Sequence, residues 1–364
     1  MTIKLPFLAK ASLFFVGLYA LISMLYIAQG IIVPTIFSVI LAIVLHPVVN
    51  FFVRMKINRV LAIILTLIVT VIFIATFSVF IFSQAMHFGE TWPQLVVKFT
   101  DMFNQGIGLA SGYFDISTKE INAWITKSKD ELFSTSGTAI GQTLINVGNS
   151  LVVIFIIPVY VFMLLFYHPL LIEFIRRVFG ADNRSVVSQI ITQIRKIIQQ
   201  YLTGLSIEVL IISILHSIGL LILGIDYAIL LGIIGALLNL IPYLGGIVSV
   251  ALPMMVALAT KSSPWVAVYV LVIYYIIQLI DNNYIIPKIV ASKVKINALV
   301  SIVVVLAFGA LWGLPGMFLS IPLTAIAKVI FDQIDSLKPW GFLLGDTMPV
   351  IEIFKLNLGL KTKK

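Results

Sequence analysis

The stretch "LNLIPYLGGIVSVALP", residues 238–253, decides the fold class of this chain. It lies in the middle of 34 consecutive residues without a charge, residues 227–260. As one helix, these residues would extend about 51 Å, too long for one crossing of a hydrocarbon core about 30 Å thick and too short for two. The proline and the two adjacent glycines at its centre therefore predict a broken helix or a re-entrant hairpin inside the membrane.

The composition of the whole chain indicates a helical integral membrane protein. Of its 364 residues, 60% are hydrophobic and 11% are charged, and the mean hydropathy is +1.12. Soluble domains carry about 25% charged residues, so this chain lacks the polar surface of a water-soluble globule. We attribute the net charge of +9 to orientation in the membrane and expect no nucleic acid as a partner. The chain has no cysteine, which excludes disulfides and thiolate metal sites.

Other charge-free runs predict an all-α integral membrane protein with about eight transmembrane helices. Residues 11–53 carry no Asp, Glu, Lys or Arg, and as one helix they would extend about 65 Å. They are expected to form a hairpin that turns within residues 29–34, where Gln, Gly and Pro interrupt the apolar pattern. A second interrupted run, residues 296–327, contains "WGLPGM" at 312–317 and predicts another broken or re-entrant hairpin. Further spans are expected near residues 60–83, 151–167, 204–223 and 264–280.

The chain is expected to divide into six parts. The capping patterns "TWPQ" (91–94) and "STKE" (117–120) precede amphipathic stripes, which indicates a small helical subdomain outside the membrane. The stretch 185–200 has the stripe of an amphipathic helix at the membrane surface. The predicted parts are N-terminal transmembrane helices (1–83), an extracytoplasmic helical subdomain (84–142), a transmembrane helix (143–168), a cytoplasmic amphipathic helix (169–200), a C-terminal transmembrane core with broken hairpins (201–335) and a cytoplasmic tail (336–364).

The distribution of lysine and arginine predicts that both termini lie in the cytoplasm. With the N-terminus inside and the spans alternating, 19 of the 24 lysines and arginines fall in cytoplasmic segments. Such an excess is typical of the cytoplasmic loops of membrane proteins. The same bias places residues 281–295 inside and residues 84–142 outside. Each broken hairpin must then cross the membrane an even number of times or re-enter it.

The sequence lacks the motifs of common enzymes. We find no His-Glu-x-x-His, no Gly-x-Ser-x-Gly and no phosphate-binding loop, so we expect neither an enzyme, nor a cofactor, nor an ATP-driven pump. The histidines lie in different segments without metal-ligand spacing. His46 and His168 each precede a proline at the end of a predicted span, and we interpret both as interfacial side chains.

Ionisable side chains inside the predicted spans are candidates for ion coupling, because a central carboxylate costs about 2.5–3.5 kcal/mol on insertion scales. Glu208 lies near the start of its span, where either a structural role at the interface or a proton or cation site would fit. His216 lies two turns further along the same helix and could share a cavity with Glu208. Asp281 ends an uncharged run, and we predict that it forms an inner gate by pairing with a lysine such as Lys288 in one conformation.

Four motifs in the C-terminal half resemble those of a known family. They are "YLTG" (201–204), "LLGIIGALLNLIPYLGGIVSVALP" (230–253), "DNNYIIPKIV" (281–290) and "FGALWGLPGMFLSIPLTAIAK" (308–328). Occurring together and in this order, they resemble the autoinducer-2 exporter family of bacterial membrane proteins over about residues 201–330. The sequence departs from the family pattern at Thr203, where a lysine or arginine is common, and at Asn297 and Ala298, where His-Pro is common. These departures concern the substrate rather than the fold.

The resemblance implies a multi-pass, homo-oligomeric protein of the bacterial inner membrane with a re-entrant feature near the C-terminus. Some members of the family are connected with export of the quorum-sensing signal autoinducer-2, and others exchange sodium or lithium ions for protons. It therefore implies secondary export of a small polar solute, with sodium(lithium)/proton antiport as the alternative. A third hypothesis is a non-transport oligomeric scaffold or receptor that presents residues 84–142.

The two broken hairpins form the predicted substrate path, because Gly/Pro-interrupted segments point to the binding sites of many transporters. An uncharged, hydroxyl-rich solute needs amide and hydroxyl partners, whereas a cation needs carboxylates and freed backbone carbonyls. The expected partners are a small polar solute or a monovalent cation with protons, together with membrane lipids. The candidate coupling or gate residues are Glu208, Asp281 and Lys288, and the candidate path residues are Asn239, Pro242, Tyr243, Gly245, Gly246, Gln278, Asn282, Asn283, Gly309, Gly313, Pro315 and Gly316.

Overall fold

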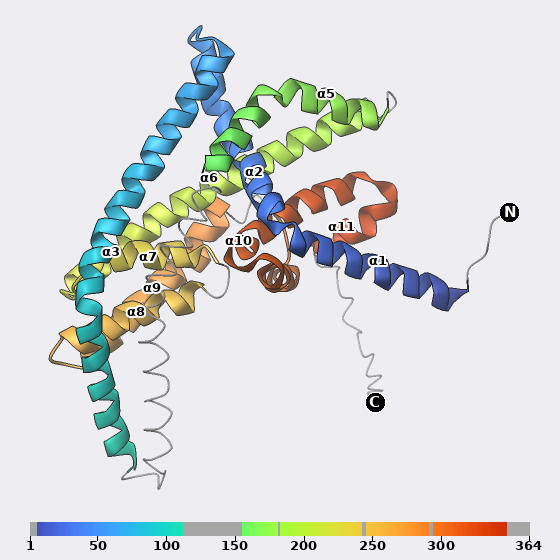
Figure 1. Cartoon of the computed structure of the whole chain (residues 1–364). Coiled ribbons are helices and arrows are strands. Elements are labelled where there is room, and N and C mark those ends of the chain that lie inside the picture. The colour runs from blue at the N-terminus through green and yellow to red at the C-terminus, as the bar shows by residue number, and fades with distance from the viewer. Residues whose placement is uncertain (1–5, 112–154, 181–182, 242–244, 291–293, 348–364) are drawn as a thin grey trace, which may run out of the picture.

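The computed structural model of the chain is built from helices (Figure 1). It describes residues 6–111, 155–180, 183–241, 245–290 and 294–347, and no strand occurs in these ranges. Six helices of the described ranges are long and apolar enough to cross a membrane, or seven if one bent pair of helices is a single span. The predicted all-α, multi-pass membrane fold is therefore confirmed, whereas the count of eight spans is not.

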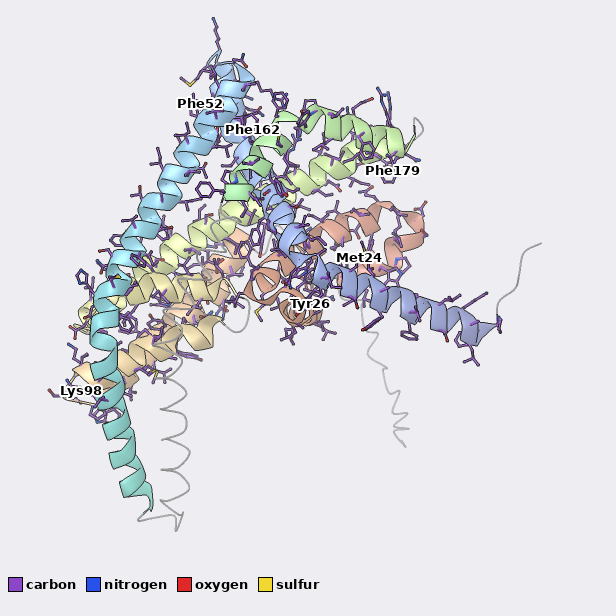
Figure 2. The ribbon with its side chains drawn as sticks, in the orientation of Figure 1. Met24, Tyr26, Phe52, Lys98, Phe162 and Phe179 are labelled. Carbon is purple, nitrogen blue, oxygen red and sulfur yellow. The ribbon has the colours of Figure 1, made fainter. Side chains whose placement is uncertain are left out.

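Helices α1 (Phe7–Ile27) and α2 (Gln29–Arg54) are separated by Ala28 alone. The break falls one residue before the predicted segment 29–34, and Pro34 lies inside α2. The two helices meet at an open angle and do not fold back on each other (Figure 1), so the predicted N-terminal hairpin is wrong. Helix α1 buries none of its residues and extends away from the other helices (Figure 1). Its apolar side chains, among them Met24 and Tyr26, point outward (Figure 2), as expected for a helix in contact with lipid.

Helix α3 (Arg59–Ser111) is the longest element and contains 53 residues. Its apolar part, Arg59–Gly89, has the length and hydropathy of a span. The helix continues through residues 91–94 without a break, so the expected helix start at "TWPQ" is not present. The second capping pattern, at residues 117–120, and most of the predicted outer subdomain lie outside the described residues.

The next span is bent. The helix Phe155–Phe166 and α5 (His168–Val178) meet at an angle of 65° around Tyr167. The proline after His168 occupies the first turn of α5, where its missing N–H costs nothing. Helix α6 (Arg184–Ile222) follows as one continuous helix of 39 residues. It joins the predicted amphipathic segment 185–200 to the predicted span 204–223.

The stretch quoted at the outset forms most of a helical hairpin. Helix α7 (Ala228–Asn239) packs against α8 (Gly245–Thr260), and a side chain at Gly245 would collide with the Leu238 carbonyl. The 12 residues of α7 extend about 18 Å, well short of a hydrocarbon core about 30 Å thick. A re-entrant hairpin therefore fits these lengths better than two crossings.

Helix α9 (Trp265–Ile280) continues directly into a π-helix, η1 (Asp281–Val290). The sequence suggested that the helix ends at Asp281 and that a loop follows. Instead, the backbone continues as a π-helix through Pro287. π-Helical segments are rare, and those found within helices are frequently at functional sites.

Helix α10 (Ala298–Gln333) contains the second predicted break. Gly313 has φ 64° and ψ −145°, a backbone conformation that is almost restricted to glycine. The interruption expected at residues 312–317 is thus present. The last described elements are η3 (Asp335–Leu337) and α11 (Lys338–Leu344), and α11 folds back onto α10.

The orientation of the chain in the membrane stays a prediction, which cysteine labelling can test. Because the chain contains no cysteine, Ala110→Cys and Lys338→Cys each introduce a single thiol. We expect an impermeant maleimide to label the cysteine at 110 in intact cells and the one at 338 only after the membrane is permeabilised. Equal labelling of both positions in intact cells would contradict the predicted topology.

Candidate functional site

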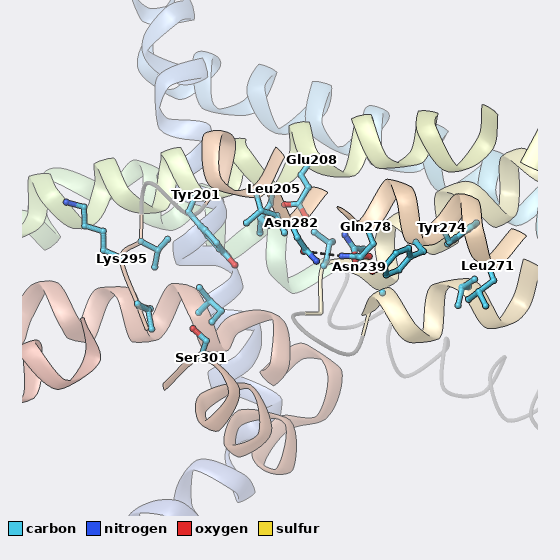
Figure 3. A pocket seen from close by; sticks show the side chains of 18 residues that line it. Tyr201, Leu205, Glu208, Asn239, Leu271, Tyr274, Gln278, Asn282, Lys295 and Ser301 are labelled. Carbon is cyan, nitrogen blue, oxygen red and sulfur yellow. Dashed lines mark hydrogen bonds between the residues drawn. The ribbon is translucent and has the colours of Figure 1, made fainter. Parts of the chain in front are cut away.

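A cavity of about 790 Å³ lies between α6, the α7–α8 hairpin, the α9–η1 helix and α10. Figure 3 shows Tyr201, Lys295 and Ser301 towards one end and Leu271 towards the other, with the polar side chains between them. The volume is that of a typical small-molecule site. The lining residues are Tyr201, Leu205, Glu208, Asn239, Leu240, Gly246, Val250, Leu271, Tyr274, Tyr275, Gln278, Asn282, Ile286, Val294, Lys295, Ile296, Ser301 and Ile321.

One face of the α9–η1 helix supplies most of the neutral polar groups. Tyr274, Gln278 and Asn282 follow at intervals of four residues, and all three line the cavity. The Gln278 amide donates a hydrogen bond of 3.2 Å to the Asn282 side-chain oxygen. The third path candidate on this segment, Asn283, bonds instead to the Leu279 carbonyl at 2.8 Å and is exposed. The predicted path residues Gln278 and Asn282 thus meet at the cavity, and Asn283 does not.

Asp281 is fully buried and joins η1 to α7. Its Oδ2 atom accepts a hydrogen bond of 2.9 Å from the Asn239 amide, and its Oδ1 atom has no hydrogen-bond partner. A buried carboxylate oxygen without a partner is costly, so it usually serves a proton, a cation or a second conformation. The widened turn of η1 begins at this residue.

Glu208 lies on α6 across the cavity from the hairpin and is 4% exposed. Its charged neighbour is the Asp281 carboxyl group. Like charges repel, so the two carboxyl groups together favour a shared proton or a bound cation. Among the described residues, no group of three His, Asp or Glu side chains is placed to hold a metal ion.

Among the described residues, no lysine pairs with Asp281 in this conformation. Lys288 is exposed, and its ammonium group lies 5.9 Å from the centre of the Tyr284 ring. Lys328 pairs with Asp332, one turn further along α10. The predicted inner gate, in which Asp281 pairs with a lysine, is therefore not seen in this conformation. It stays a prediction for a second conformation of the protein. Lys295, which the sequence reasoning missed, lines the cavity.

The glycines of the α7–α8 hairpin lie beside the cavity. Gly246 lines it, and a Cβ atom built there would approach the Gln278 Oε1 atom to 2.7 Å. Gly245 instead touches backbone atoms of α7. Pro242 and Tyr243 lie outside the described residues.

The second broken segment does not line this cavity. Gly309 faces the Met317 side chain, and Gly316 faces the Phe308 carbonyl within α10. Gly313 makes the break itself. Of α10, only Ser301 and Ile321 belong to the lining. The structure thus separates the candidate path residues Gly309, Gly313, Pro315 and Gly316 from the hairpin residues.

A second polar cluster lies behind the cavity wall. It contains His216, which therefore does not share the cavity with Glu208 as the sequence suggested. The His216 ring of α6 stacks on the Tyr274 ring of α9, with centroids 4.0 Å apart. The His216 Nδ1 and Tyr274 hydroxyl atoms are buried without hydrogen-bond partners, and both lie near Gly235 of α7. Tyr274 lies four residues before Gln278 on the same helix face, and this spacing is the one signal that could have revealed it.

These features define a multi-pass helical membrane protein with a small-molecule cavity at a broken hairpin, an arrangement found in membrane transporters. The chain belongs to the AI-2E family of transporters, since a family model described as "AI-2E family transporter" matches residues 13–336. The resemblance drawn from the four C-terminal motifs is thereby confirmed.

Relatives with curated names agree with this assignment. The chain is 28% identical over 155 residues to "Putative transport protein YueF" of Bacillus subtilis, an alignment that covers 43% of this chain and 42% of that protein. It is 25% identical over 342 residues to "Putative transport protein" of Haemophilus influenzae, which covers 90% and 93% of the two chains. It is 24% identical over 327 residues to "AI-2 transport protein TqsA" of Escherichia coli, which covers 88% and 90%.

Proposed function

We propose that the protein exports a small, uncharged, hydroxyl-rich solute across the bacterial inner membrane by secondary transport. The observation that carries this proposal is the pair of neutral amides, Gln278 and Asn282, along one wall of the cavity. Amide groups match the hydroxyl groups of a solute without requiring a charge. Autoinducer-2 has this chemistry, and the similar protein TqsA is named as a transporter of AI-2.

Antiport of sodium or lithium ions against protons is the second candidate. It is favoured by the two buried carboxyl groups, Glu208 and Asp281, and by the Asp281 Oδ1 atom without a partner. Carboxylate oxygens at a break in membrane helices are typical ligands of coupling cations. In antiport, the two carboxyl groups bind the transported cation itself. In solute export, they bind only the ion that drives transport.

Vesicles that contain the purified protein separate the two candidates. They are loaded with autoinducer-2 and a pH-sensitive dye, and efflux of the signal and movement of protons are recorded with and without a sodium gradient. We expect efflux of the signal above that of empty vesicles, driven by a proton gradient. Sodium-driven proton movement without any efflux would contradict the proposal and support antiport.

A further inference from the structure

Three nitrogen-rich side chains from distant parts of the chain gather where α2, α5 and α6 meet. The His46 ring of α2 and the His168 ring of α5 have centroids 4.9 Å apart. The Arg195 guanidinium of α6 lies 2.8 Å from the His168 Nε2 atom. Arg59 of α3 also faces both rings and donates a hydrogen bond of 2.9 Å to the Leu165 carbonyl. We call His46, His168 and Arg195 the cationic cluster.

The hydrogen bonds of the cationic cluster leave it rich in donors. A guanidinium group only donates, so the His168 Nε2 atom accepts from Arg195 and the ring proton lies on Nδ1. The His46 Nδ1 atom contacts the Asn50 amide nitrogen at 3.1 Å, so the His46 proton lies on Nε2. Each of the three side chains therefore keeps N–H groups that need an acceptor.

No carboxylate of the described residues supplies that acceptor. The acids that form ion pairs in these ranges are Glu173, Asp332 and Asp335, and none pairs with the cationic cluster. Arg195 is half-buried, and its side-chain partner is a neutral imidazole. Arginine in such places usually binds a carboxylate or a phosphate through two parallel hydrogen bonds. The cluster thus has the charge and the donors for one anion.

The position of the cluster points to the source of this anion. His168 lies at the bend between the apolar helix Phe155–Phe166 and the amphipathic helix α5, and His46 lies two turns before the basic end of α2 at Arg54. Both positions fit the membrane surface. A hollow of about 360 Å³ between α2, α6 and η1 begins at Pro47, next to His46, and at Gln199, one turn from Arg195. Basic pockets between helices at this depth hold lipid head groups.

We propose that His46, His168 and Arg195 bind the phosphate group of an anionic phospholipid. The phosphate accepts from the guanidinium and the two imidazole rings, while the hollow between α2 and α6 takes the part of the lipid next to the head group. Such a lipid would hold together the bent helix at His168 and the long helix α6, which carries Glu208. This site is separate from the cavity and does not depend on which solute is transported.

Native mass spectrometry of the purified full chain with added phosphatidylglycerol tests the proposal. We expect Arg195→Gln, and the double variant His46→Gln with His168→Gln, to retain roughly tenfold less of this lipid than the wild type. The control is Arg177→Gln, which removes the same charge from exposed α5, where Arg177 pairs with Glu173. Equal retention by Arg195→Gln and wild type, or equal loss in the control, would overturn the site. Thermal unfolding in lipid-free detergent should match the wild type for each variant.

Two additions identify what the cluster recognises. Phosphatidylcholine carries no net charge, and we expect it to be retained several-fold less than phosphatidylglycerol. Inorganic phosphate at millimolar concentration should leave the bound lipid in place, because it gains nothing from the hollow. Displacement of the lipid by inorganic phosphate would overturn the lipid assignment, as would equal retention of the two lipids.

Discussion

Gly246→Leu is expected to reduce transport by roughly tenfold or more while the protein is still inserted and folded. A Cβ atom at this position would lie 2.7 Å from the Gln278 Oε1 atom, which is the movable end of a side chain rather than backbone. The added side chain therefore displaces Gln278 and occupies the cavity instead of breaking the hairpin. If the added side chain raises the barrier to solute passage by about 1.4 kcal/mol, transport slows about tenfold.

The measurement compares solute efflux from vesicles with the yield of folded protein in the membrane. Gly17→Leu is a matched control, because Gly17 lies on exposed α1 with no atom within 4 Å of the added Cβ atom. Gly316→Leu is expected to behave differently and to lose folded protein, since its side chain would collide with the Phe308 carbonyl. If Gly246→Leu loses yield and efflux in equal proportion, Gly246 serves helix packing and not the transport path.

The breaks in the helices could be predicted because they depend on local backbone chemistry. Gly313 adopts a conformation that other residues avoid, and its neighbours in "WGLPGM" carry that signal in the sequence. The break between α1 and α2 was likewise predicted to within one residue, because residues 11–53 are too long for one span, but the hairpin expected there is not present. The number of spans could not be predicted in this way, since α7 is apolar enough for a membrane but too short to cross it.

The arrangement around Asp281 could not be predicted, because it depends on contacts between distant residues. Its partner Asn239 lies 42 positions earlier in the chain, and the sequence suggested a lysine instead. The stacked pair of His216 and Tyr274 joins two helices that no periodic pattern relates.

Asn297, where the sequence departs from the family pattern, has a structural role that the contacts show. Its side chain caps α10 at Val300 and donates to the carbonyls of Leu343 and Gly345, so it connects the end of α11 to the start of α10.

Asp281→Asn is expected to preserve the fold but to cut transport by roughly tenfold and to weaken its dependence on pH between about pH 6 and pH 8. The amide has the shape of the carboxyl group, and the Asn239 amide can rotate so that its oxygen accepts instead of its nitrogen donating. What the amide lacks is the ability to bind and release a proton. Because Asp281 is fully buried and its Oδ1 atom has no partner, a change in its charge must alter the contacts of η1 with α7.

The measurement is efflux from vesicles across this pH range, with the wild type, Asp281→Asn and Glu208→Gln compared at equal protein content. Asp226→Asn is the matched control, since Asp226 is an exposed acid between α6 and α7 and should transport like the wild type. If Asp281 pairs with a lysine in one conformation, transport by the wild type should slow at the pH at which that pair forms. Asp281→Asn cannot form the pair, so the variant should not show this slowing. If Asp281→Asn transports like the wild type at every pH, Asp281 only supports the π-helix, and the coupling group is then expected at Glu208, the other buried carboxyl group of the cavity.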